Sequence, residues 1–240
     1  MLLDRLRYEL RITGWWVWLI PLLIMLCLVP LALVFIHLNT QNLRIVQVLT
    51  AGLEMLLPVA VALLVANQVG YDAALELHLT FPSRYALTAA LRVALVLLES
   101  ACIACISSAF LYHLKYLRIP AQLHGMMVLP QFLTLQLSWL APLSWLAALG
   151  ICVSLLLHSR TASSALLGGL WMLEAIFYGY FALLDGLKPF FLFPTTLDPT
   201  ISFWLLNRWG LLGMALLLFV LGWLLLHNSE SLLRGSAGGE

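Results

Sequence analysis

The sequence contains very little charge for its length. Charged residues make up 10% of the 240 residues, whereas hydrophobic residues make up 63%. A soluble globular domain carries about a quarter charged residues, so this composition excludes an ordinary soluble enzyme. The formal net charge is only +1, which favours neither nucleic acid nor an acidic substrate as a partner. The apolar residues form long continuous runs, and such runs predict membrane-spanning helices.

Lysine is almost absent, and this excludes one class of chemistry. Only Lys115 and Lys188 are present, and each follows a leucine. A phosphate-binding P-loop needs Gly-Lys followed by Ser or Thr, so no P-loop ATPase is encoded here. No two of the six histidines are four residues apart, and no metal site is predicted. An intramembrane serine protease is not favoured either, because Ser107 and Ser108 lack a Gly-x-Ser context.

Six apolar segments are long enough to cross a membrane. A helix rises ~1.5 Å per residue, so a hydrocarbon core of ~30 Å needs about 20 apolar residues. The fourth segment is longer than that, so either it is tilted or residues 126–137 form a separate interfacial piece. The six predicted spans are residues 15–38, 48–69, 87–114, a part of 126–157, 162–184 and 205–226.

The two ends of the chain differ from the apolar middle. Residues 1–14 place leucines at helical spacing between charged residues, which predicts an amphipathic helix on the inner membrane surface. Residues 235–240 are expected to form a disordered tail. Lys and Arg are slightly more numerous on the side of the N-terminus when Arg208 is assigned to an outer loop, so both termini are expected to be cytoplasmic. We therefore expect one permease-like domain, residues 1–240, in the cell (inner) membrane.

Three connections between the predicted spans are distinctive. Residues 70–86 lie on the inner side and contain a stretch that predicts one short helix, with Asp72 as its N-cap and Pro82 at its end. Residues 158–161 are a minimal turn, which makes spans four and five antiparallel neighbours. Residues 185–208 are too rich in phenylalanine for a solvated loop, and they predict a re-entrant element on the outer side before span six.

The layout and one local motif resemble the membrane subunit of type-2 ABC exporters, the ABC-2 permease family. The resemblance covers nearly the whole chain: an amphipathic entry helix, six spans, an inner helix after span two and a re-entrant element before span six. The motif is LELHLTFPSR, residues 75–84. It is similar to the family's Leu-Glu-x-Leu-Leu-x-x-Pro-x-Ser-Arg stretch, which follows an acidic residue and Gly-Thr. Here Asp72-Ala73-Ala74 stands where the family has Gly-Thr.

The resemblance implies an all-α membrane protein that works with other subunits. The short inner helix would be a coupling helix that docks on an ATPase through Asp72, Glu76, Pro82 and Arg84. Two separate ATPase subunits would bind ATP and Mg²⁺, and a second permease, identical or related, would complete the path. No cofactor is expected in this chain, and membrane lipid would surround it. In the alternative interpretation, Glu76 and Arg84 only solvate a loop, and the protein is a non-transporting membrane scaffold or assembly factor.

Three glutamates fall inside predicted spans, where a charge is costly. Glu174 either lines the translocation path or subunit interface, or is a protonated residue satisfied within one subunit. For Glu99, tight packing among small residues is the favoured interpretation, and for Glu54 it is an interfacial position in water. A small apolar protein with few external polar residues suits a lipid-like or hydrophobic peptide cargo, and the family resemblance implies export of a drug or antibiotic peptide. The expected cargo is therefore lipid-like, an antibiotic or a peptide. The residues predicted to line the path are Glu174, Trp171, Phe177, Tyr178 and Glu54.

Overall fold

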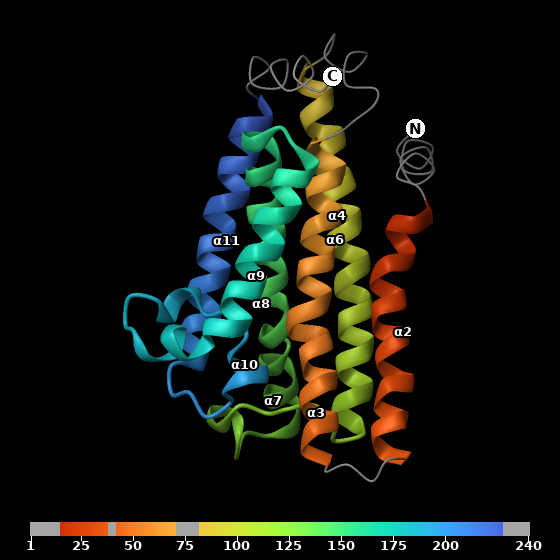
Figure 1. The fold of residues 1–240 in the computed structure, drawn as a ribbon, viewed down its shortest axis with the longest axis vertical. Coiled ribbons are helices and arrows are strands. Elements are labelled where there is room, and N and C mark those ends of the chain that lie inside the picture. The colour runs from red at the N-terminus through yellow and green to blue at the C-terminus, as the bar shows by residue number, and fades with distance from the viewer. Residues whose placement is uncertain (1–14, 38–41, 71–81, 228–240) are drawn as a thin grey trace.

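The described part of the chain, residues 15–37, 42–70 and 82–227 of the computed structural model, is a bundle of long helices without a β-strand (Figure 1). Helices are what the lipid environment demands, because each one pairs its backbone polar groups within its own segment. In chain order the helices are α2 (Trp15–His37), α3 (Asn42–Ala51), the π-helical turn η1 (Gly52–Leu56), α4 (Leu57–Gly70), α6 (Pro82–His113), η2 (Ala121–Leu123), α7 (Val128–Leu135), α8 (Leu137–Leu157), α9 (Arg160–Leu183), η3 (Lys188–Phe190), α10 (Pro194–Leu197) and α11 (Trp204–His227).

Among the described residues, five helical segments are long and apolar enough to cross a membrane. They are Leu43–Val69, Ala86–His113, Val128–Leu157, Arg160–Leu183 and Trp204–His227. The prediction of an all-helical, multi-pass membrane protein is therefore confirmed at this level. Helix α2 coincides with the first predicted span, but its described apolar stretch, Leu19–Leu28, is shorter than a crossing needs. The six-span arrangement therefore stays a prediction.

Helix α8 is the centre of the bundle, and it packs most extensively against α4 and α11. The contact with α4 is very close at Gly150, where a Cβ atom would lie 2.8 Å from the carbonyl oxygen of Ala62. One turn further along, the hydroxyl of Ser154 donates a 2.7 Å hydrogen bond to the carbonyl of Ala66. Small residues allow this approach, as is typical of helix pairs in membranes.

The fourth predicted span consists of two helices in series. Gln136 alone separates α7 from α8, and its own backbone is in the right-handed helical region. The 21 residues of α8 are enough for a ~30 Å core, and α8 is mostly buried. The outward side chains of α7, in contrast, are exposed, with Val128 71% exposed. Val128–Leu157 is nevertheless one apolar segment long enough to cross a membrane, so the choice between a tilted span and a separate interfacial piece stays a prediction.

The second predicted span contains an irregular turn near its middle. The amide of Leu57 bonds to the carbonyl of Gly52, five residues back, which makes Gly52–Leu56 a π-helical turn. Pro58 follows directly and has no N–H to continue the regular ladder. Such turns change the direction of the side chains they carry and are frequent at functional sites. Here the turn carries Glu54, which is completely buried, so the prediction of a water-exposed interfacial residue is wrong.

The turn between α8 and α9 has the predicted minimal length. His158 adopts a left-handed conformation at φ 51° and ends α8, and the hydroxyl of Ser159 accepts a 3.3 Å hydrogen bond from the amide of Ala162 to cap α9. This turn, the end of α4, the start of α6 and the end of α11 lie at one end of the bundle, whereas α7 and the start of α3 lie at the other (Figure 1).

Residues 100–109 of α6 are rich in small side chains, and they pack on one side only. Ser100 and Ala104 are buried, but Cys102 and Cys105 are exposed and unpaired. Glu99 is half-buried, and its Oε2 has no hydrogen-bond partner within the described part of the chain. The expected tight packing around Glu99 therefore does not extend to the face that carries the two cysteines.

Candidate functional site

The candidate site is formed where residues 184–203, which we call the inserted segment, fold against the bundle between α9 and α11. The segment contains only the short helices η3 and α10, and it lies toward the end opposite the α8–α9 turn (Figure 1). Its middle is more deeply buried than a surface loop, because Phe191, Leu192, Phe193 and Thr195 are all 0% exposed. The N–H and C=O groups of irregular backbone at membrane depth need hydrogen-bond partners from the protein. Three charged side chains provide such partners here.

Glu54 holds the N-terminus of α10. Its Oε1 accepts a 3.0 Å hydrogen bond from the amide of Thr195, and its Oε2 accepts a 2.6 Å bond from the amide of Thr196. These amides belong to the first turn of α10, which begins at Pro194. First-turn amides have no partner within their own helix, and proline at the first position needs none. The carboxylate therefore acts as a cap supplied by a distant helix, and the positive end of the helix dipole favours its charge.

Arg208 on α11 neutralises Glu54. Its Nη2 donates to Glu54 Oε1 in an ion pair with both side chains fully buried, and Nη1 donates a 2.8 Å bond to the carbonyl of Leu192. The guanidinium also lies over the ring of Trp204, whose Nε1 donates to the hydroxyl of Thr195 at 2.9 Å. Buried charges persist only when paired and hydrogen-bonded, and both conditions are met. The prediction that Arg208 lies in an outer loop is wrong, because it belongs to the first turns of α11.

Glu174 is the third charged group and comes from α9. It is 2% exposed, and its Oε1 accepts a 3.0 Å hydrogen bond from the amide of Leu192. Its Oε2 has no hydrogen-bond partner among the described residues. Glu174 also lines a cavity of about 150 Å³ beside the inserted segment. Glu54 and Glu174, both predicted as path residues, thus bind the same segment from different helices.

Further polar contacts anchor the two ends of the inserted segment. Arg118 Nη1 donates a 2.5 Å bond to the carbonyl of Thr196, and Asn207 Nδ2 donates a 2.8 Å bond to the carbonyl of Lys188. Lys188 in turn forms an exposed ion pair with Asp185. The hydrogen bond and the charge of Lys188 lower the pKa of Asp185 below its ordinary value. We call Glu54, Glu174 and Arg208, together with the backbone groups that they bind, the buried cluster. The contacts of Arg118 and Asn207 fix the backbone of the inserted segment on both sides of this cluster.

The three predicted aromatic path residues lie elsewhere on α9. Trp171 donates from Nε1 to the carbonyl of Met55 at 3.1 Å, beside the π-helical turn. Phe177 and Tyr178 are 48% and 43% exposed. None of the three lines the cavity that Glu174 lines. The structure therefore brings Glu54 and Glu174 together around the inserted segment. Trp171 contacts the turn that carries Glu54, whereas Phe177 and Tyr178 are partly exposed.

The predicted coupling residues lie mostly outside the described part of the chain. Asp72 and Glu76 fall within residues 71–81 and so cannot be placed. Pro82 is the first residue of α6, which suits its fixed φ and missing N–H. Arg84 belongs to the first turn of the same helix, so α6 begins a few residues before the predicted third span.

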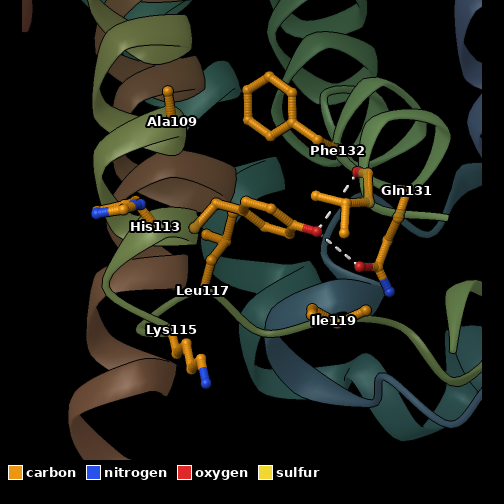
Figure 2. A pocket seen from close by; sticks show the side chains of 9 residues that line it. Ala109, His113, Lys115, Leu117, Ile119, Gln131 and Phe132 are labelled. Carbon is orange, nitrogen blue, oxygen red and sulfur yellow. Dashed lines mark hydrogen bonds between the residues drawn. The ribbon is translucent and has the colours of Figure 1, made fainter.

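A second, larger cavity lies near the end of the bundle opposite the α8–α9 turn, between α6 and α7 (Figure 2). It has a volume of about 720 Å³ and is lined mainly by apolar residues. Its polar side is built by Tyr112, whose hydroxyl donates a 2.7 Å bond to Gln131 Oε1. His113 and Lys115 project away from Gln131 at the opposite margin in Figure 2. No sequence motif marked this cavity, because it depends on the pairing of two segments.

Four residues that bind the inserted segment or each other were not predicted as site residues: Arg208, Thr195 and Thr196, which are buried, and Arg118, which is only partly buried. Pro194 followed by two threonines is a helix-start signal, and it could have indicated free amides there. Nothing local indicates that Arg208 is buried, because a charge near the end of an apolar run is more often interfacial. Within the described residues, no three His, Cys, Asp or Glu side chains are grouped as metal ligands would be.

Comparison of the chain with protein-family models, with curated proteins and with solved structures finds no match.

Proposed function

We propose that this chain is the membrane subunit of an ATP-driven exporter of the type-2 ABC class. One observation carries most of the argument. Glu54, Glu174 and Arg208 come from three separate helices, and all of them bind the irregular backbone of the inserted segment inside an apolar bundle. Ionisable groups at membrane depth are expensive and usually mark a transport pathway or a moving part. Broken backbone at that depth is likewise a feature of transport proteins.

In this proposal the inserted segment is the re-entrant element on the outer side of the membrane. Its amides and carbonyls are tied to α4, α9 and α11, so a relative movement of these helices would displace it. A change in the spacing of α4 and α11 would act directly on the Glu54–Arg208 pair, which joins the two helices. The segment would thus transmit helix movement to the outer mouth of the path for a hydrophobic or amphipathic substrate.

Movement driven by ATP would be transmitted to the bundle at the end that contains the α8–α9 turn. The start of α6 and the α8–α9 turn lie together there (Figure 1), and residues 70–86 connect α4 to α6 at this end. The coupling helix would contact one of two ATPase subunits through Asp72, Glu76, Pro82 and Arg84. ATP and Mg²⁺ would bind to those subunits, and a second permease, identical or related, would complete the transporter in the cell (inner) membrane. Both termini would be cytoplasmic.

The first test is to purify the chain in mild detergent from its native membrane and to identify the proteins that accompany it. A stoichiometric P-loop ATPase is expected. If the intact, folded chain purifies without an ATPase, the transporter proposal fails and the scaffold interpretation replaces it.

The second test addresses coupling in the purified complex. We expect the double variant Glu76→Gln, Arg84→Gln to lose at least half of the ATPase stimulation, because it removes the charges that would pair with the ATPase. The matched control Arg44→Gln, Asp198→Asn removes the same number of charges at the opposite end and should keep full stimulation. Unchanged stimulation in the first variant would exclude Glu76 and Arg84 as coupling residues.

A further inference from the structure

The cavity beside Glu174 has an unusual lining for its size. It measures about 150 Å³, and aromatic rings form much of its wall: Trp145, Phe181 and Phe190. Leu170, Leu187 and Leu192 complete the lining with Glu174. Trp145 and Phe181 are buried, whereas Phe190 is 43% exposed. The cavity is therefore lined by apolar residues apart from Glu174, and Phe190 is the most exposed of its three aromatic residues.

Glu174 is the only ionisable side chain among the residues that line this cavity. One of its oxygens is occupied by the amide of Leu192, and the other has no hydrogen-bond partner in the described structure. A buried polar atom without a partner is costly and calls for an explanation. The nearest buried cation, Arg208, is already bound to Glu54 and to the carbonyl of Leu192. With both glutamates ionised, the cluster carries one negative charge more than Arg208 can balance.

Water alone is a poor partner for the unpaired oxygen of Glu174 and cannot balance the excess negative charge. The cavity exceeds the ~10–15 Å³ that one water needs, but a buried water requires two to four polar partners. A primary ammonium has three N–H donors to satisfy, and the free oxygen of Glu174 is one acceptor. A methylated ammonium needs no hydrogen bond at all. It is attracted both by a carboxylate and by the faces of aromatic rings, which is how aromatic cages recognise quaternary ammonium groups.

We propose that this cavity binds a quaternary ammonium group, with Glu174 as the counter-charge and Trp145, Phe181 and Phe190 as the aromatic wall. The group can belong to a free small cation or to the headgroup of a choline lipid. The small volume admits the headgroup and not a whole drug-sized molecule, for which pockets of ~300–1,000 Å³ are usual. The inference needs no ATPase partner and holds for the chain alone.

The test is equilibrium binding of radiolabelled tetramethylammonium to the full chain, purified in a maltoside detergent that has no choline group. We expect saturable binding to one site. Glu174→Gln keeps an acceptor for the amide of Leu192 but removes the charge, and it should weaken binding about tenfold or more. Methylammonium should compete about tenfold less well than tetramethylammonium, because its N–H groups would lose their water partners.

Two further variants separate binding from folding. Phe190→Leu keeps an apolar side chain in the lining of the cavity and makes no change to the carboxylate, and it should weaken binding several-fold through the lost ring face. Glu99→Gln, the matched control, neutralises another carboxyl group with an unpartnered oxygen, on α6 and outside this cavity, and should bind like the wild type. All variants are first checked for wild-type thermal unfolding.

Absence of saturable binding in the folded wild type would overturn the proposal, as would equal binding by Glu174→Gln or preference for methylammonium. The source of the quaternary ammonium group is then determined by repeating the binding measurement with the chain in lipid nanodiscs. Phosphatidylethanolamine has the same net charge as phosphatidylcholine but no quaternary ammonium, so surface attraction of the cation is equal in the two lipids. Weaker binding of tetramethylammonium in phosphatidylcholine than in phosphatidylethanolamine assigns the site to a lipid headgroup, and equal binding assigns it to a free cation.

Discussion

At the scale of single residues, the Glu54–Arg208 pair is the most demanding feature of this protein. Both side chains are 0% exposed, so each has lost its hydration completely. Coulomb attraction alone seldom repays that loss. The additional bonds from the amides of Thr195 and Thr196 satisfy both oxygens of Glu54, and the carbonyl of Leu192 accepts from Nη1 of Arg208. Among the described residues, Nε of Arg208 has no hydrogen-bond partner. The pair is therefore stable only while the inserted segment stays in place.

Removal of one member of the Glu54–Arg208 pair should destabilise the protein much more than removal of both members. Arg208→Met leaves the carboxylate of Glu54 buried without a counter-charge, which typically costs about 3–5 kcal/mol. We expect a large drop in the midpoint of thermal unfolding in detergent. The double variant Glu54→Gln, Arg208→Met should lie closer to the wild type than the single variant does, because position 54 then carries no buried carboxylate that has lost its counter-charge.

The exposed pair of Lys188 and Asp185 provides the comparison. Lys188→Met should change the unfolding midpoint little, because exposed ion pairs contribute little. A wild-type midpoint for Arg208→Met would contradict the buried ion pair.

At the scale of helices and turns, the close contact of α4 with α8 determines where Glu54 lies. Gly150 lets the two helices approach at Ala62, and the π-helical turn lies about two to three turns before Ala62 in the same span. The turn directs Glu54 into the bundle, toward α10 and α11. Helix spacing and charge placement are therefore coupled through α4.

Gly150→Ala is expected to separate these helices. The added methyl group would meet the carbonyl oxygen of Ala62, which is backbone and cannot move aside cheaply, so we expect a loss of about 1–3 kcal/mol in chemical or thermal unfolding. Gly213→Ala on α11 is the matched control, because nothing lies within 4 Å of its added Cβ. There the better helix propensity of alanine should give a gain of up to about 1 kcal/mol. Equal effects at both glycines would mean that the α4–α8 contact is looser than described.

At the scale of the whole molecule, the bundle has two different ends. The α8–α9 turn and the start of α6 occupy one end, and α7 together with the end of α6 occupies the other (Figure 1). The inserted segment lies toward the second end, with the buried cluster around it. This division fits a protein driven from one membrane face and opening at the other.

Cysteine labelling in cells tests this orientation. With the four native cysteines replaced, Thr161→Cys beside the α8–α9 turn should react with a membrane-impermeant maleimide only after permeabilisation. His124→Cys, exposed at the opposite end, should react in intact cells. The reverse pattern would invert the proposed orientation, and labelling of both from one side would contradict a bundle that crosses the membrane.

The sequence alone predicted the features that depend on neighbouring residues. The long apolar runs located the helices α6, α9 and α11 to within a few residues, except that α6 begins earlier at Pro82. The turn at residues 158–161 was equally local, because a helix end and an N-cap need only adjacent groups. The abundance of phenylalanine in residues 185–208 indicated burial, and the middle of that segment is indeed buried.

The tertiary structure decided which charges meet. Glu54 and Arg208 are 154 residues apart in the chain, and each taken alone resembles an interfacial residue near the end of a span. A hydropathy scale gives every charged residue the same unfavourable value, because the scale contains no information on a counter-charge that is distant in the chain. Only the packing of α4, α9 and α11 around the inserted segment supplies partners for Glu54 and Arg208 while leaving one oxygen of Glu174 unpaired. The helices therefore follow from local sequence, whereas the site follows from long-range contacts between them.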